Sequence, residues 1–131
     1  MKNVFRPLVV ASLIAAVINQ AIYFLATGFL EVEFLLTNPA GMAIPLFAPA
    51  LFSVFQGVVG GVIVAWIAAR TKSPQNVWLS VSLIALALSF VLPFGGISTI
   101  EGALWLNLMH VVAGALIIPM VRSALPAAAA Q

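Results

Sequence analysis

Residues 2–33 read KNVFRPLVVASLIAAVINQAIYFLATGFLEVE. The part from Leu8 to Leu30 contains no charged side chain, whereas two basic residues precede it and two glutamates follow it. A helix of this length extends roughly 34 Å, against about 30 Å for the hydrocarbon core of a bilayer. The stretch therefore predicts a transmembrane helix with basic residues at one end and acidic residues at the other.

Three further apolar stretches follow the first. We predict one membrane domain over residues 1–131, with spans at about residues 8–30, 45–69, 77–93 and 103–121 and a short tail at 123–131. The first span is interpreted as a retained anchor, because it is too long for a secretory signal peptide and no small-x-small cleavage site follows it. Lipid offers the backbone no hydrogen-bond partners, so all four spans are expected to be helices.

The charged side chains all fall outside these spans and sort into two groups. The basic residues lie before the first span, between the second and third spans, and after the fourth, whereas the acidic residues lie in the other two connections: Lys2, Arg6, Arg70, Lys72 and Arg122 against Glu31, Glu33 and Glu101. Cytoplasmic loops are enriched in Lys and Arg. We therefore predict an all-α, up-down-up-down bundle of four transmembrane helices in the bacterial inner membrane, with both termini in the cytoplasm.

The composition excludes a soluble domain. The chain is 64% hydrophobic and 6% charged, whereas soluble domains are about half apolar and about one quarter charged. The sequence pI of 9.7 does not indicate a nucleic-acid partner, because membrane topology explains the basic residues and they form no cluster. The chain has no Cys, no Asp and one His, so we expect no self-contained metal site.

The connection from residue 37 to residue 49 is too apolar for a solvated loop. An NPAG turn at residues 38–41 is followed by large apolar side chains around Pro45. Two interpretations remain open. The segment lies in the outer interface or caps the bundle, or else Pro45 or Pro49 begins the second span early, since proline suits the first turn of a helix.

The second span carries a small residue at every fourth position, and this ridge includes a GxxxG motif. Its members are Ser53, Gly57, Gly61 and Ala65. Small residues let membrane helices approach closely. The ridge predicts helix packing within one bundle, with a homodimer face and a groove for a lipid or pigment as the alternatives.

Uncharged polar residues inside the spans are the candidates for a site. They are Asn19, Gln20, Tyr23, Gln56, Asn107 and His110. Antiparallel helices would bring Asn19, Gln56 and His110 to one level, which predicts a polar layer in the bundle interior. Such a layer either joins helices by hydrogen bonds or binds a lipophilic molecule with a polar head, such as a quinone, carotenoid, sterol-like lipid or tetrapyrrole.

His110 is the one residue in the spans that could serve as an axial ligand to haem or chlorophyll. Light-harvesting helices usually have a small residue four positions before such a His, but here Leu106 occupies that place. Bis-His haem ligation would require a second chain. A neutral His that donates a hydrogen bond to a backbone or amide oxygen is the favoured interpretation.

The sequence lacks the common catalytic motifs, and nothing positive in it supports an enzyme. Small multidrug exporters share the size and the span number, but they depend on a Glu within the first helix, where this chain has Asn19 and Gln20. Their dual insertion also needs a weak charge bias, whereas the bias here is complete. Proton-coupled transport would have to rest on His110 alone.

The second half of the chain, Trp78–Val121, resembles an uncharacterised family of small bacterial four-helix membrane proteins. The resemblance rests on the SFVLP sequence at 89–93, a short Thr-containing loop, the LNLMHVVAG sequence at 106–114, and Pro119. It implies a bacterial inner membrane and draws attention to the Leu-Met-His segment. It carries over no activity.

These observations together predict a non-enzymatic integral membrane protein. It is either an accessory or structural subunit of a membrane complex or a binder of a lipophilic molecule or cofactor between its helices. Its expected partners are the lipid bilayer and, laterally, other membrane proteins or further copies of itself. The alternative is a small transporter or channel that acts as a homo-oligomer through the ridge on the second span.

Overall fold

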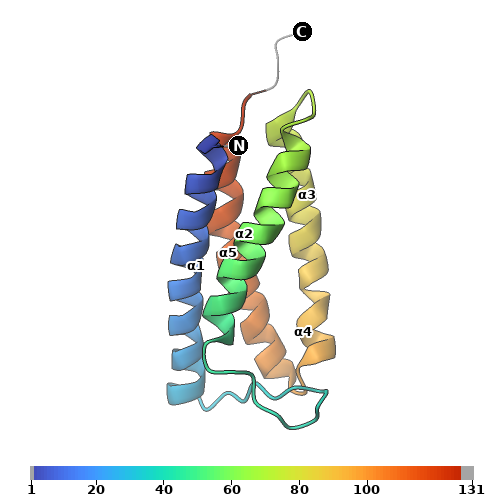
Figure 1. The fold of residues 1–131 in the computed structure, drawn as a ribbon. Helices are drawn as coiled ribbons and strands as arrows, with labels where there is room; N and C mark the ends of the chain where they lie inside the picture. Colours follow the sequence, from blue (N-terminus) through green and yellow to red (C-terminus); the bar gives the residue numbers. More distant parts are fainter. Residues whose placement is uncertain (1, 128–131) are drawn as a thin grey trace.

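The computed structural model describes residues 2–127 and folds them into a helical bundle (Figure 1). The helices are α1 (Lys2–Phe29), α2 (Ala48–Ala68), α3 (Pro74–Ser89), α4 (Val91–Gly96) and α5 (Ile100–Ala124). Within this range there are no strands, only two isolated β-bridges. The prediction of an all-α chain is therefore confirmed.

Within residues 2–127, four helical stretches are long and apolar enough to cross a membrane. They are Asn3–Phe29, Ala48–Ala68, Pro74–Gly96 and Ile100–Ala124, so that α3 and α4 together make the third stretch. Consecutive stretches run in opposite directions, and the start of α1 lies at the same end of the bundle as the end of α5 (Figure 1). The described ends of the chain are thus on one side, as the charge pattern requires.

All four helical stretches differ from the expected spans by a few residues, since α1 begins at Lys2, α2 at Ala48 and α3 at Pro74. The third stretch continues past Pro93 to Gly96, because the helix is interrupted at Phe90 and Pro93 falls in the first turn of α4, where a missing N–H removes no helix hydrogen bond. The last helix begins at Ile100, after Thr99, whose side chain accepts a hydrogen bond from Gly102 N. It continues to Ala124, into the expected tail, and residues 128–131 lie outside the described range.

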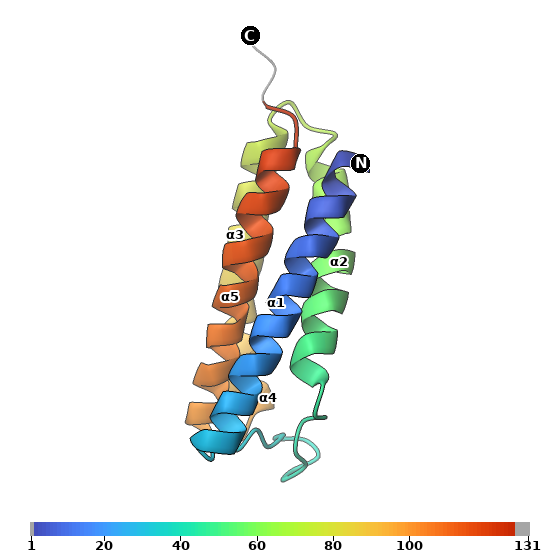
Figure 2. The same cartoon turned by 90° about the vertical axis from the view of Figure 1, so that its left-hand side faces the viewer.

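α1 packs into the groove between α2 and α5 (Figure 2). Near the basic end of the bundle, Leu8 of α1 is fully buried in a cluster with Ala65, Trp78 and Val121. Near the acidic end, α1 contributes Tyr23 to a second cluster with Phe34 and Met109. Because helices pack by fitting the side chains of one into the grooves of another, these two clusters hold the ends of the bundle together.

Trp78 lies near the basic end of the bundle, and its side chain is buried between the helices. Only 1% of its surface is exposed, and its indole Nε1 donates a hydrogen bond to Ile118 O of α5 at 2.9 Å. Trp66 is half exposed, and the guanidinium carbon of Arg70 lies 3.3 Å from the centroid of its ring. Trp78 therefore joins α3 to α5, while Trp66 makes a cation–π contact at the surface.

The segment after α1 folds back across the acidic end of the bundle. Its backbone forms hydrogen bonds within the segment, from Leu36 N to Met42 O and from Ile44 N to Phe34 O. It also joins the end of α4, since Thr37 N donates to Gly96 O at 2.9 Å. Residues 35–47, which we name the cap, therefore close the end of the bundle. α2 begins at Ala48 with Pro49 in its first turn, and Pro45 lies in the cap.

Candidate functional site

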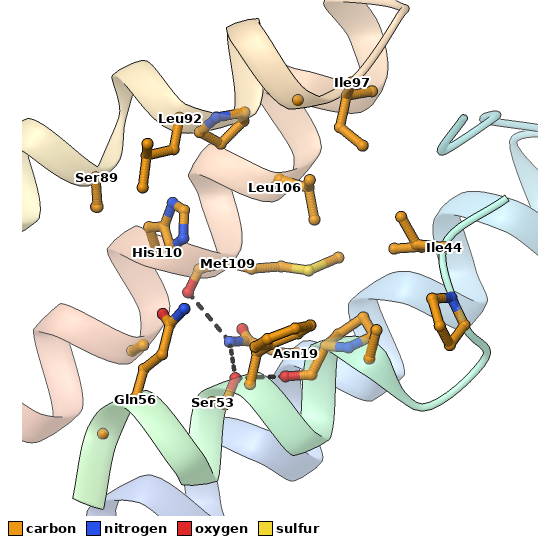
Figure 3. Close-up of a pocket in the computed structure, with 18 of the residues that line it drawn as sticks. Asn19, Ile44, Ser53, Gln56, Ser89, Leu92, Ile97, Leu106, Met109 and His110 are labelled. Carbon is orange, nitrogen blue, oxygen red and sulfur yellow. Dashed lines mark hydrogen bonds between the residues drawn. The ribbon is translucent and has the colours of Figure 1, made fainter. Parts of the chain in front are cut away.

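A cavity of about 600 Å³ lies between α2, α4 and α5, with one wall contributed by α1 (Figure 3). Pockets that bind small molecules commonly occupy about 300–1,000 Å³. Most of the lining is apolar, and the polar side chains in it are Asn19, Ser53, Gln56, Ser89 and His110. The volume and the mixed lining are those of a site for a largely apolar molecule.

The cavity exists because α2 approaches α1 closely and leaves α4 at a distance. An added Cβ at Gly57 would collide with Ser12 Oγ, and one at Gly61 would collide with Leu8. The small ridge predicted on α2 therefore faces α1 of the same chain. At the basic end, Trp78 of α3 packs in the same cluster as Ala65 of α2, but toward the acidic end the space between the helices is not filled by side chains.

Asn19 joins three helices at the wall of the cavity. Its side chain is 3% exposed, and its Nδ2 donates to Ser53 Oγ of α2 at 2.9 Å and to Met109 O of α5 at 3.2 Å. Ser53 Oγ in turn donates to Pro49 O at 2.7 Å. Asn19 Oδ1 is buried and has no hydrogen-bond partner within residues 2–127. Buried amide oxygens without a partner are rare, because desolvation is costly.

Gln56 and His110 face each other across the cavity from α2 and α5 (Figure 3). Neither side chain is hydrogen-bonded to another residue of the described chain, and His110 Nδ1 is buried without a partner. An imidazole offers one donor and one acceptor when neutral, and an amide offers both. The pair can therefore receive a molecule that accepts or donates hydrogen bonds, without any formal charge.

Three of the predicted polar residues lie outside the cavity lining. Gln20 holds the cap, since its Nε2 donates to Leu46 O at 2.9 Å and its Oε1 accepts from Ala50 N at 3.4 Å. The ring of Tyr23 packs against Phe34, with centroids 5.1 Å apart. Asn107 Nδ2 donates to Phe90 O at 3.2 Å, where α3 gives way to α4.

The sequence pattern places Ser53 in the packing ridge and gives no indication that Ser89 belongs to a site. Both line the cavity, although their hydroxyls already donate to Pro49 O and to Leu86 O. A signal for Ser53 was present, because it lies one turn before Gln56 on the same helix. No comparable signal exists for Ser89, which reaches the cavity only through the way α3 and α4 pack.

The cavity is electrically neutral. Within the described chain, no Lys, Arg, Asp or Glu lines it, and no group of three or more His, Cys, Asp or Glu residues could hold a metal ion. His110 is the single imidazole of the sequence. The arrangement can thus bind a neutral group by hydrogen bonding, and a metal-containing pigment would have only His110 as a protein ligand.

The described residues form a small helical bundle in which four stretches are long and apolar enough to span a membrane, as in multi-pass membrane proteins. A family model described as a family of unknown function (DUF6069) matches residues 1–127, and the chain belongs to this family. The expected resemblance to an uncharacterised family is thus confirmed, and the match includes the first half of the chain as well as the second. No curated protein and no solved structure gives a match.

Proposed function

We propose that this protein crosses the bacterial inner membrane four times and binds a neutral lipophilic molecule in the cavity between α2, α4 and α5. The described ends of the chain lie on the cytoplasmic side. In support, Arg6, Arg70 and Arg122 lie at one end of the bundle and Glu33 and Glu101 at the other. Positive residues mark the cytoplasmic side, and the exposed surfaces of all four helical stretches are rich in large apolar side chains.

The observation that carries the binding function is the unpaired polar pair on an otherwise apolar cavity. Both side chains line the cavity without a hydrogen bond to another residue of 2–127; His110 Nδ1 is buried, whereas Gln56 is exposed. Polar groups inside a membrane are costly unless they are paired. A bound molecule that offers a hydrogen-bonding group at this depth would satisfy both side chains, while its apolar part would occupy the rest of the cavity.

The direct experiment is to isolate the molecule. The full chain is purified from its native membrane in a mild detergent, extracted with organic solvent and analysed by mass spectrometry and by absorbance. We expect one lipophilic species, enriched over the membrane lipids and present at about one per chain. His110→Leu and Gln56→Leu should each reduce its content, because each removes one of the two unpaired polar side chains.

Asn107→Leu is the matched control. Asn107 lies on α5 one turn from His110 and does not line the cavity; its Nδ2 donates to Phe90 O, and its Oδ1 is buried without a partner within residues 2–127, as His110 Nδ1 is. Its replacement removes an equally polar group from the same helix and should leave the content of the bound molecule unchanged. Equal loss in all three variants, or no enriched species in the wild-type extract, would refute the proposed function.

A further inference from the structure

The cavity is closed toward water at the acidic end of the bundle. Leu36 and Ile44 of the cap and Ile97 after α4 form this wall. The cap is held on both sides, because Leu36 pairs with Ile97 in an antiparallel bridge and Ser98 N donates to Leu35 O at 2.9 Å. Gln20 of α1 is about nine-tenths buried and holds the far side of the cap through Leu46 O.

The opposite end and the back of the cavity are closed as well. Toward the basic end, the buried cluster around Leu8, Ala65 and Trp78 fills the space between the helices. At the back, α1 and α5 meet directly, and Asn19 bridges them with its hydrogen bond to Met109 O. No route from water to the cavity passes through either of these regions.

The remaining side of the cavity is the flank between α2 and α4. The lining side chains on this flank are exposed: Phe52 on α2 is 58% exposed, Leu92 on α4 is 71% exposed, and Gln56 is exposed between them. In a protein that spans the bilayer, side chains at this depth face lipid. The flank is therefore an opening from the cavity to the hydrocarbon phase.

The polar groups lie part-way along the cavity, not at its ends. Gln56 and His110 are each more than two helical turns from the acidic ends of α2 and α5. Apolar residues continue on both sides of them, with Leu92 and Ile97 toward the cap and Ala113 and Ile117 toward the basic end. A charged phospholipid head at this depth would meet no countercharge, and a pure hydrocarbon would leave both polar side chains unpaired.

The geometry points to lateral uptake, from the bilayer through the flank between α2 and α4, of a neutral lipophile with hydrogen-bonding ring oxygens, of the quinone or quinol class. This inference rests on the proposed function and adds the chemical class of the molecule and its route. The ring oxygens pair with Gln56 and His110, and the apolar tail extends along the cavity or out between the helices. The cap stays in place during uptake.

The ligand class is tested with the full chain in phospholipid vesicles and two probes. Decylubiquinone carries ring oxygens, and decylbenzene has the same tail without them. We expect native mass spectrometry to show one decylubiquinone per chain, with no displacement by decylbenzene. Gln56→Leu and His110→Leu should each weaken binding about tenfold, the loss expected for one hydrogen bond. Equal binding of decylbenzene, or no effect of either substitution, would overturn the ligand class.

The route is tested by locking the cap and by narrowing the flank. The sequence has no cysteine, and opposite residues of an antiparallel pair have Cβ atoms about 4.5–5.5 Å apart, close to disulfide geometry. Leu36→Cys/Ile97→Cys can therefore be oxidised to tie the cap to the chain after α4. We expect the oxidised and reduced forms to take up decylubiquinone at the same rate. Slower uptake in the oxidised form would overturn the lateral route and favour access past the cap.

Leu92→Trp narrows the flank and should slow uptake several-fold, whereas Leu88→Trp is the matched control. Leu88 is 66% exposed one turn earlier on α3 and does not line the cavity. Circular dichroism checks that both variants keep their helices, and equal rates in the two would overturn the route. If the wild-type chain does not bind decylubiquinone but a different lipophile co-purifies with it, this inference fails and the proposed function stands. If no lipophile co-purifies either, both fail.

Discussion

The close contact of α2 with α1 predicts that substitutions at two neighbouring glycines, Gly60 and Gly61, have different effects on stability. A Cβ added at Gly61 would collide with Leu8 Cδ1 and would lie 3.1 Å from Leu8 Cδ2 and 3.3 Å from Leu8 Cγ. A Cβ added at Gly60 meets nothing within 4 Å. The two positions share a helix, a depth and a backbone conformation, so Gly60→Ala is the matched control for Gly61→Ala.

The expected difference follows from two opposing terms. Gly→Ala in a helix interior favours the folded state by up to about 1 kcal/mol, and this term is common to both variants. Overpacking at Gly61 opposes it by about 1–3 kcal/mol. Leu8 is 0% exposed and sits in a buried cluster, so it has little room to move aside. Gly61→Ala should therefore be about 1–3 kcal/mol less stable than Gly60→Ala.

Reversible unfolding in mixed detergent micelles, followed by circular dichroism, measures this difference. Leu8→Val, which shortens the opposing side chain, should reduce the penalty of Gly61→Ala in a double-mutant cycle while leaving that of Gly60→Ala unchanged. Equal stability of Gly61→Ala and Gly60→Ala would refute the reasoning, because it would mean that Leu8 and the α1–α2 contact are not where the structure places them.

Three further predictions concern other parts of the fold. Asn19→Leu removes the side chain that joins α1 to α2 and α5 and should cost about 1 kcal/mol in the same unfolding assay; an unchanged stability would contradict this role. Trp78→Phe removes a buried hydrogen bond to α5 and should cost about 1–2 kcal/mol, and it should abolish the most blue-shifted part of the tryptophan emission. In sealed inner-membrane vesicles of known orientation, single cysteines in place of Lys72 and Glu101 should react with a membrane-impermeant maleimide from opposite faces. Reaction of both from one face would refute the predicted topology.

The number and approximate place of the helical stretches were predictable from the sequence. Uncharged apolar runs of sufficient length are rare outside membrane proteins, and the charges between them mark the connections. The interruption at Phe90 was harder to predict from the sequence, because Pro93, Gly95 and Gly96 indicate the end of a helix. In the structure these residues instead form α4, a short continuation of the third stretch.

The candidate site was predictable only in part. Depth along a helix can be counted from the sequence, and this brought Asn19, Gln56 and His110 to one level. Rotation about the helix axis cannot be counted in the same way, because these helices are apolar on all faces and have no polar stripe to set their orientation. For the same reason, the sequence does not predict that Gln20, which follows Asn19 directly, points to the cap and not to the cavity.

Length, hydropathy and charge order are properties of the chain alone, so the sequence by itself determined the helical class, the approximate boundaries of the long stretches and the sorting of basic and acidic residues. Which polar side chains remain unpaired depends on neighbours that are distant in sequence, and these are set by how tightly each pair of helices packs. Because Gly57 and Gly61 have no side chain, α2 packs close against α1, and space remains beside α4. Only the tertiary structure therefore decided that a cavity exists, that Gln56 and His110 face it, and that it opens on one flank.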